Sequence, residues 1–312
     1  MTIEPETPPS TRTLVLSIGG AAVAAALATG LAFRALTPIP HAPVLRRFEI
    51  VAKVSRLAGI SPDGKTIAYV DDGKLLLRPL DSFEATIVTA PAAPSVLFWS
   101  TDSSHLAFAA GRTFWKVPAS GGGVTAIADI GNTRTGGDSA SWCPDGSIIL
   151  SAGNSGILRV PPGGGDLKEI LPAGTGKVGG IHEPTCLADG SILYVPHSEG
   201  GRSDSLWILA DGKSRELLRV EPDQDIWSPV YSPAGFILYH RHPANAGIWA
   251  LPFSLPKRRA TGEPFLVVAN GELPRVSRDG TLTYVRSSGV PENLGNIMVV
   301  ENWAQQFRAD GR

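Results

Sequence analysis

Hydrophobic and polar residues follow one another in short runs along most of the chain, and this pattern predicts β-strands. Apolar runs of about five residues, such as TIAYV at 66–70 and SILYV at 191–195, alternate with turns rich in Gly, Pro, Asp and Ser. Short strands bounded by turn residues at regular intervals are typical of all-β proteins. Residues 14–33 depart from this pattern, because they form a twenty-residue stretch without any charge.

The turns between the strands belong to an internal repeat. A turn related to S/C-P-D-G, followed by a β-type run and a third strand, occurs six times, and its aspartate column advances in steps of 39, 43, 44, 45 and 45 residues. Members of this column are Asp63, Asp102, Asp145, Asp189, Ala234 and Asp279. Steps of this length are typical of the blades of a β-propeller. The sequence therefore predicts an all-β, six-bladed β-propeller, preceded by a single N-terminal transmembrane helix.

The repeated aspartates and glycines have a local role in these turns. Asp can accept a hydrogen bond from the backbone two residues further on, and Gly tolerates the positive φ of a tight turn. We therefore expect the aspartates to stabilise their own turns rather than to form a calcium ladder. The triple glycines at 121–123 and 163–165 are likewise expected to be hairpin turns, because neither is followed by the GK[ST] ending of a phosphate-binding loop.

A propeller must join its first and last blades. The last repeat ends soon after residues 297–301, and an unassigned strand, RRFEIVAK at 46–53, precedes the first repeat. Pairing this strand with the last blade would remove an exposed sheet edge. We therefore expect a propeller domain at 46–308 that is closed by the N-terminal strand 46–53.

The region before the propeller is expected to tether it to a membrane. Residues 1–12 form a short tail, 13–36 a transmembrane anchor and 37–45 a proline-rich linker. Twenty residues at ~1.5 Å each give about 30 Å, which is enough to cross a bilayer. A retained anchor is favoured over a cleaved signal peptide, because Glu4 and Glu6 outweigh Arg12 in the leader. The arginines after the segment favour, weakly, a cytoplasmic C-terminal part.

The charge of the chain limits its possible partners, and its cysteines raise the question of a disulfide. The 28 Lys and Arg against 29 Asp and Glu give a net charge of −1, so no basic surplus exists to bind a phosphate backbone, and nucleic acid is not an expected partner. Cys143 and Cys186 are the two cysteines of the chain, and they occupy non-equivalent positions of neighbouring repeats. We therefore expect two buried free thiols.

Several longer segments carry a resemblance to known families. They include LLLRPLDS at 75–82, ILRVPPGGG at 157–165, SRDGTLTYV at 277–285 and VENWAQQF at 300–307. The repeats resemble TolB-type propellers, which are relatives of the WD type, and are similar to the C-terminal propeller of bacterial membrane serine/threonine kinases. The resemblance implies a single-pass protein of the bacterial inner membrane with a periplasmic propeller. Only twelve residues precede the predicted anchor at 13–36 here, so we expect no kinase domain.

Motifs of known enzymes are not found in the sequence. It contains no G-x-S-x-G nucleophile elbow and none of the kinase motifs V-A-I-K, HRD or DFG. His240 and His242 lack a nearby third metal ligand, and we expect neither a metal nor another cofactor. Two alternatives remain: a lyase-like or lactonase-like propeller enzyme with a cation at the funnel mouth, or the sensor half of a split kinase system.

Positions at the start of each innermost strand provide the candidate binding site. Such residues line the mouth of a propeller's central funnel. Counting seven positions before the aspartate column gives Arg56, Ser95, Asp138, His182, Trp227 and Glu272, and Glu183 and Arg275 flank this ring. Three positions before the column lie Ile60, Trp99, Trp142, Cys186, Tyr231 and Val276, an expected apolar packing layer. We therefore expect a non-catalytic, membrane-anchored propeller that binds a protein, a peptide or a small ligand at one face.

Overall fold

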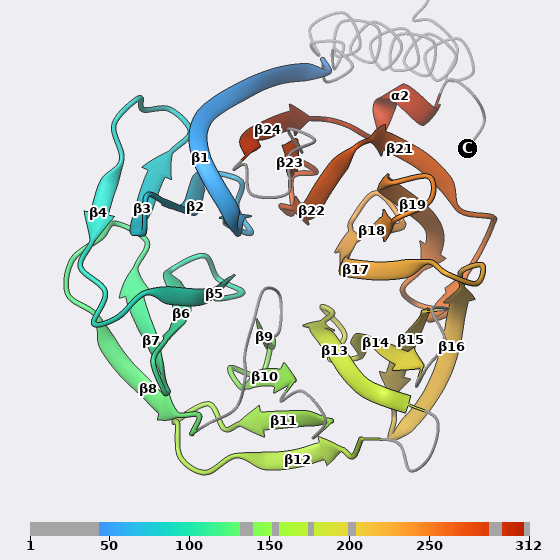
Figure 1. The fold of residues 1–312 in the computed structure, drawn as a ribbon, viewed down its shortest axis with the longest axis horizontal. Coiled ribbons are helices and arrows are strands. Elements are labelled where there is room, and N and C mark those ends of the chain that lie inside the picture. The colour runs from blue at the N-terminus through green and yellow to red at the C-terminus, as the bar shows by residue number, and fades with distance from the viewer. Residues whose placement is uncertain are drawn as a thin grey trace, which may run out of the picture. The chain divides into compact units, whose positions relative to one another are not determined.

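The chain folds into a ring of β-sheets. The computed structural model describes residues 44–131, 140–151, 156–173, 178–198, 204–286 and 295–308. Within these residues, six antiparallel blades surround a central axis (Figure 1). The all-β, six-bladed propeller expected from the repeat is thereby confirmed. The predicted anchor at 13–36 lies outside the described residues, and no helix within them is long and apolar enough to cross a membrane.

Blade 2 shows the common plan of a blade. Its strands follow one another from the central axis to the outer edge, and each pairs antiparallel with the next. They are β5 (Pro94–Trp99), β6 (His105–Ala110), β7 (Thr113–Pro118) and β8 (Thr125–Asp129). Leu106, Phe108 and Phe114 on the middle strands are fully buried, because both faces of a blade are covered by its neighbours. The hydrophobic core therefore lies between the blades.

The next two blades repeat this plan. Blade 3 consists of β9 (Ala140–Trp142), β10 (Ile148–Ser151), β11 (Ile157–Val160) and β12 (Lys168–Leu171). Blade 4 consists of β13 (Val178–Cys186), β14 (Ile192–Ser198), β15 (Ser205–Ala210) and β16 (Lys213–Arg219).

Blade 5 departs slightly from the plan. It consists of β17 (Asp225–Ser232), β18 (Phe236–His242), β19 (Gly247–Ser254), β20 (Arg259–Ala260) and β21 (Phe265–Ala269). Both of the last two strands pair with β19, so the blade carries an additional short hairpin at its outer side.

Blades 6 and 1 share one long strand. Blade 6 contains β22 (Gly271–Val276), β23 (Leu282–Arg286) and β24 (Gly295–Glu301), and blade 1 contains β2 (Thr66–Asp71), β3 (Lys74–Pro79) and β4 (Thr86–Val88). Strand β1 (Arg46–Ile60) belongs to both. Its first part pairs with β24, where Phe48 faces Val299, and its last part pairs with β2, where Ile60 faces Ile67. The N-terminal strand thus joins the two ends of the ring by backbone hydrogen bonds.

The repeated turns are held by their own side chains. The carboxylate of Asp102 accepts hydrogen bonds from the Ser100 hydroxyl, at 2.6 Å, and from the backbone N–H and hydroxyl of Ser104. Hydrogen bonds from the Ser100 and Ser104 hydroxyls hold the pKa of Asp102 well below its ordinary value. Asp145 and Asp189 accept equivalent bonds from the serines two residues on. The expected turn role of the aspartates is confirmed.

The C-terminal end of the described chain packs on blades 5 and 6. After β24 the chain enters the short helix α2 (Gln305–Arg308), and Trp303 just before it is almost fully buried. Its ring lies 5.6 Å from Phe236, and Phe307 lies 4.9 Å from Phe265. Aromatic side chains thus fill the junction between these two blades.

The expectation of two free thiols was wrong. Cys143 and Cys186 form a disulfide, with 5.2 Å between their Cα atoms. The two positions are one residue apart in the repeat, but the ends of inner strands from neighbouring blades lie side by side around the axis. The N–H of Cys186 also donates to the Ser141 hydroxyl of blade 3 at 3.1 Å. Equivalence in the repeat was therefore the wrong criterion, because contact across a blade junction does not require it.

Candidate binding site

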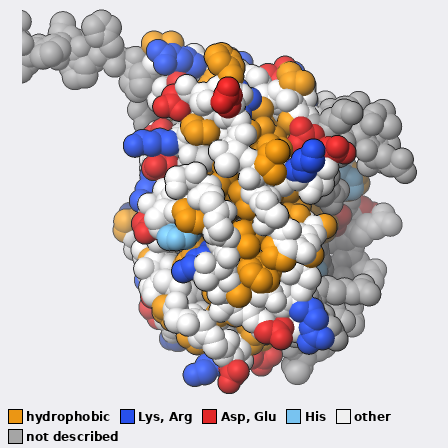
Figure 2. All heavy atoms as spheres, turned by 90° about the vertical axis from the view of Figure 1, so that its left-hand side faces the viewer, with side chains coloured by type: hydrophobic (Ala, Val, Ile, Leu, Met, Phe, Trp, Pro, Cys, Tyr) orange, Lys and Arg blue, Asp and Glu red, His pale blue; other side chains and the backbone are white. Residues whose placement is uncertain are grey.

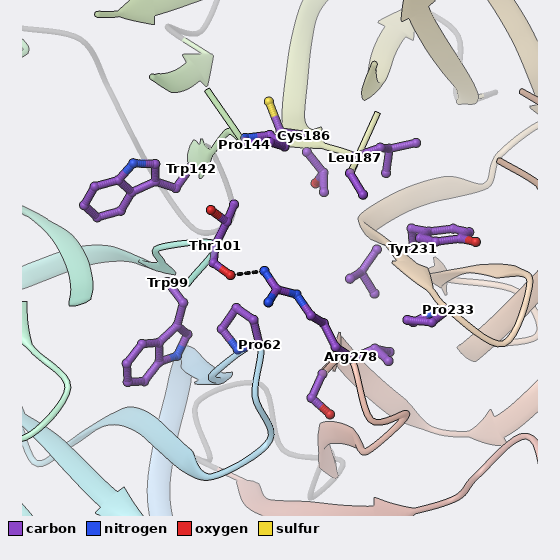
Figure 3. A pocket seen from close by; sticks show the side chains of 15 residues that line it. Pro62, Trp99, Thr101, Trp142, Pro144, Cys186, Leu187, Tyr231, Pro233 and Arg278 are labelled. Atoms are coloured by element: carbon purple, nitrogen blue, oxygen red, sulfur yellow. Dashed lines mark hydrogen bonds between the residues drawn. The ribbon is translucent and has the colours of Figure 1, made fainter. Parts of the chain in front are cut away.

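The inner strands of all six blades surround a central channel that opens widely at one end. Each inner strand ends at a repeated turn, and a cavity of about 720 Å³ lies at this turn end (Figure 3). Clefts of ~300 to 1,000 Å³ are the size that holds drug-sized ligands. We name this cavity the turn-end funnel.

Two sets of equivalent repeat positions form most of its wall. The first set comes from the last residues of the inner strands, three positions before the aspartate column: Trp99, Trp142, Cys186, Tyr231 and Val276. The second set is the turn residue immediately before that column: Pro62, Thr101, Pro144, Ala188, Pro233 and Arg278. Most of these side chains are apolar, so the repeat itself builds an apolar wall. The expected packing layer is therefore, for five of its six members, the wall of an open cavity.

Hydrogen bonds fix the two tryptophans of the wall. The indole N–H of Trp99 donates to the carbonyl of Gly59 at 3.1 Å, and that of Trp142 donates to the carbonyl of Gly146 at 3.0 Å. With its polar atom satisfied by the protein, an indole can present carbon surface to a ligand without a desolvation cost at nitrogen. The two rings lie on one side of the funnel, on either side of Thr101 (Figure 3).

Tyr231 and Leu187 stand across the funnel from the tryptophans (Figure 3). Tyr231 packs edge to face on Phe253 with 6.0 Å between ring centroids. Burial, together with the negative charge of Asp189, raises the pKa of the Tyr231 phenol. The phenol is therefore neutral at physiological pH, and it adds no charge to this side of the funnel.

Among the described residues that line the turn-end funnel, Arg278 is the single charged one. Its backbone N–H donates to the carbonyl of Pro62 at 2.7 Å, which ties the blade 6 turn to the blade 1 turn. Its guanidinium reaches over the cavity and donates to the carbonyl of Thr101 on blade 2 (Figure 3). A cation thus lies over an apolar cavity.

A second, narrower cavity of about 160 Å³ is formed by the inner strands further along the channel. Arg275 and Ser228 are among its lining residues. Burial between the inner strands lowers the pKa of the Arg275 guanidinium to about 10. It therefore carries its charge at neutral pH, and its N–H donates to the carbonyl of Pro274 at 2.9 Å.

Three inner strands carry a bulge at the same position. Glu183, Ser228 and Leu273 have φ angles of 55°, 54° and 54°, and each precedes a proline. The strand register shifts at each of these sites. Glu183 is only 5% exposed, and its carboxylate accepts a hydrogen bond from the N–H of Ser228 on the next blade. The bulges at Glu183 and Ser228 therefore join blades 4 and 5.

The residues predicted from the sequence to line the mouth lie at or near the start of the inner strands. His182, Trp227 and Glu272 pair with Val195, His240 and Val285 on the next strands, and Ser95 lies at the start of β5. Asp138 lies outside the described residues, and the side chain of Arg56 is likewise not described. Of the six predicted residues whose side chains the structure describes, only Arg275 lines either of the two cavities.

The histidine pair lies at the end of β18. His240 is buried, and the ring of His242 lies 6.2 Å from it and 3.8 Å from the carboxylate of Asp225. Among the described residues, no group of three or more His, Cys, Asp or Glu side chains is placed to hold a metal ion.

The sequence contained a signal for the turn-end funnel. Three of the six residues at one strand position are aromatic, and the turn position two residues later holds Pro, Thr, Pro, Ala, Pro and Arg. A charge at one of six otherwise uncharged equivalent positions is a departure from the repeat. Polar side chains at strand starts stand out in a sequence, whereas aromatic residues at strand ends are usually core.

An apolar area on the outer side of blades 1 and 2 is the other notable surface. Figure 2 looks onto this side and shows hydrophobic side chains gathered in its middle, with charged residues around them. Phe83, which is 95% exposed, and Ile87 belong to the outer part of blade 1.

Comparisons with known proteins establish the class to which the fold belongs. No protein-family model matches the sequence, and no curated protein matches it either. The fold is shared with many solved propellers, and a TolB protein from Agrobacterium tumefaciens is among them, at 16% identity and a TM-score of 0.54 over 79% of this chain and 89% of that one. The chain is thus a six-bladed propeller with a TolB-like fold.

Propeller enzymes share the fold as well. An oligogalacturonate lyase in complex with manganese has 11% identity and a TM-score of 0.53, over 78% of this chain and 76% of that one. A gluconolactonase from Xanthomonas campestris has 13% identity and a TM-score of 0.51, over 81% and 99%. At these identities the similarity shows the fold alone, so the function must be argued from the site.

Proposed function

We propose that this propeller is a non-catalytic binding module that takes a protein, a peptide or a small ligand into its turn-end funnel. The observation that carries the proposal is the apolar cavity of about 720 Å³ with Trp99, Trp142 and Tyr231 in its wall. Aromatic side chains in a concave apolar site are typical of binding hot spots. The indole N–H groups of Trp99 and Trp142 donate hydrogen bonds to backbone carbonyls, so this part of the wall is preformed.

The proposal includes a membrane tether and an extracytoplasmic position. The uncharged stretch at 14–33 supports the tether, and the resemblance to TolB-type and kinase-associated propellers supports the position. The Cys143–Cys186 disulfide adds an independent argument, because disulfides persist in oxidising compartments such as the periplasm. It favours the periplasmic side over the weak preference of the flanking arginines.

Site-specific photo-crosslinking in cells tests the proposal. The crosslinking amino acid benzoylphenylalanine is placed at Ala188, an exposed residue of the turn-end funnel, in the full chain. It is placed in parallel at Glu272, near the opposite end of the channel, and at Phe83 on the outer edge of blade 1. We expect a discrete adduct from Ala188 alone, and we expect Trp142→Ala to weaken it.

Other patterns of crosslinking contradict the proposal. An adduct from Glu272 alone would move the binding site to the opposite end of the channel, where the inner strands start. Equal adducts from all three positions would show random contacts only, and the absence of any adduct would reject a bound partner. Release of a chemically altered small molecule by the purified chain would instead establish the alternative, a propeller enzyme.

A further inference from the structure

The turn residue before the aspartate column breaks the repeat at one blade. In the other five blades this position holds Pro62, Thr101, Pro144, Ala188 or Pro233, none of them charged, and in blade 6 it holds Arg278. All six residues line the turn-end funnel. The departure from the repeat therefore places a positive charge on the funnel wall.

The charge of Arg278 has no acidic partner in the described structure. Its hydrogen bonds go to two backbone carbonyls, those of Pro62 and Thr101. The adjacent carboxylate of Asp279 is used within its own turn, where it accepts from the Ser277 hydroxyl and from the N–H of Thr281. A guanidinium has five N–H donors in a planar fork, so donors remain for a ligand.

The surroundings of Arg278 strengthen its attraction for an anion. Walls of low polarity focus the field of a lone charge into the cavity. Trp99, Trp142 and Tyr231 contribute carbon surface to the wall of the same cavity, and Thr101, which accepts the hydrogen bond of the guanidinium, lies between the two indoles (Figure 3). A ligand that fits this site has an apolar body and one negatively charged head.

We infer that the turn-end funnel binds an apolar ligand with a single carboxylate, and that Arg278 pairs with this carboxylate. The inference rests on the proposed function and specifies its ligand class. The carboxylate can come from the C-terminus of a peptide or from a small organic acid. Arg matches a planar carboxylate with two parallel hydrogen bonds, which a neutral amide in the same place does not reproduce.

Matched acid and amide probes test the inference. The peptide pair is acetyl-Ala-Leu-Phe with a free carboxylate and the same tripeptide as its amide. The small-molecule pair is 3-phenylpropionate and 3-phenylpropionamide. Binding of each probe to the full chain in lipid nanodiscs is measured by isothermal titration calorimetry, with empty nanodiscs as the blank. We expect at least one acid to bind about 10-fold or more tightly than its amide, as a charge-assisted hydrogen bond implies.

Variants assign the effect to Arg278. Arg278→Gln is expected to abolish the preference for the acid and to leave the amide affinity unchanged. Arg286→Gln is the matched control, because this exposed arginine of β23 lies in the same blade but outside the funnel wall. It is expected to retain the preference. If the acid is preferred over the amide in the peptide pair, the ligand is a chain terminus. If the acid is preferred only in the small-molecule pair, the ligand is an organic acid.

Several results would overturn the inference. Equal binding of acid and amide, loss of the preference in Arg286→Gln as well, or no binding of any probe would each reject a carboxylate held by Arg278. The Ala188 crosslink does not depend on charge. Its presence alongside any of these results would leave the proposed binding function in place and reject only the ligand class.

Discussion

Two junctions on opposite sides of the ring hold the propeller together in different ways. At the junction of blades 6 and 1, Arg46–Ile50 of β1 pair with β24, so the contact is a continuous backbone ladder. At the junction of blades 3 and 4, Cys143 and Cys186 form a disulfide between the ends of the inner strands. The first junction closes the chain by many weak bonds, and the second uses one covalent bond.

The two junctions also differ in where they act along the blades. The ladder runs along β1 and β24, whereas the disulfide lies where the inner strands β9 and β13 end. Both junctions also contribute to the turn-end funnel, through Pro62 and Arg278 on one side and Pro144 and Cys186 on the other. Their stability therefore bears on the binding site.

Removal of the closing strand is expected to have the largest effect. A chain that begins at Val51 lacks five of the six residues of β1 that pair with β24, including Ile50, which is 2% exposed. The loss of about five ladder pairs and one buried side chain is expected to cost about 5 kcal/mol or more, comparable with the whole stability of many domains. The free energy of unfolding is measured by urea denaturation, with tryptophan fluorescence as the signal.

The control is a chain that begins at Val44 and keeps the strand. It should unfold in a single transition at a higher urea concentration, whereas the shorter chain should aggregate through the exposed edge of β24. Identical urea midpoints for the two chains would show that closure by β1 is not what holds the ring.

Loss of the disulfide is expected to have the next largest effect. The bond spans 43 residues, and replacing both cysteines by serine should lower the free energy of unfolding by about 2–4 kcal/mol. Reduction of the native chain should reproduce this loss, and the double variant should not respond to reductant. If the proposed extracytoplasmic position is right, thiol labelling of the chain taken from cells should require prior reduction, because disulfides persist in an oxidising compartment.

Ser141→Ala provides a control at the same junction. It removes only the hydrogen bond that the N–H of Cys186 donates to the Ser141 hydroxyl, so a loss of about 1 kcal/mol is expected. A loss as large as that of the double cysteine variant would mean that packing at the junction, and not the covalent bond, provides the stability.

These junctions show how much of the fold could be predicted from the sequence. The six blades were predictable because the S/C-P-D-G turn recurs at nearly constant spacing, and the turn residues stabilise themselves locally. The strand at 46–53 was expected as the partner of the last blade, and its residues 46–50 pair with β24. Both conclusions depend on patterns that are local or that follow from closing a ring.

Contacts between blades were less predictable. The pairing of Cys143 with Cys186 depends on how the inner strands converge at the axis, and no repeat pattern encodes that distance. The same limit affected the site. Trp99, Trp142 and Tyr231 were expected to belong to an apolar packing layer. They do pack against core clusters, but they also line open space at the turn end. Whether an apolar residue faces core or cavity depends on the diameter of the ring, which the hydrophobic pattern does not specify.

A small and local effect is expected where the turns of blades 6 and 1 meet. Gly64 and Gly73 have nearly the same φ, 76° and 74°, so alanine at either position costs about 1 kcal/mol of backbone strain. A Cβ at Gly73 would meet nothing within 4 Å, whereas one at Gly64 would lie 2.6 Å from a carboxylate oxygen of Asp279 on blade 6. Gly64→Ala should therefore lower the free energy of unfolding by about 1 kcal/mol more than Gly73→Ala.

A double-mutant cycle isolates the contribution of the junction. In an Asp279→Ala background the obstructing carboxylate is gone, and the two glycine variants should become equally costly. The free energies of unfolding of the four variants, measured by urea denaturation, provide the comparison. If the difference between Gly64→Ala and Gly73→Ala persists without Asp279, it arises within the blade 1 turn. The contact between the turns of blades 6 and 1 would then add no stability, and the ring would be closed by the pairing of β1 alone.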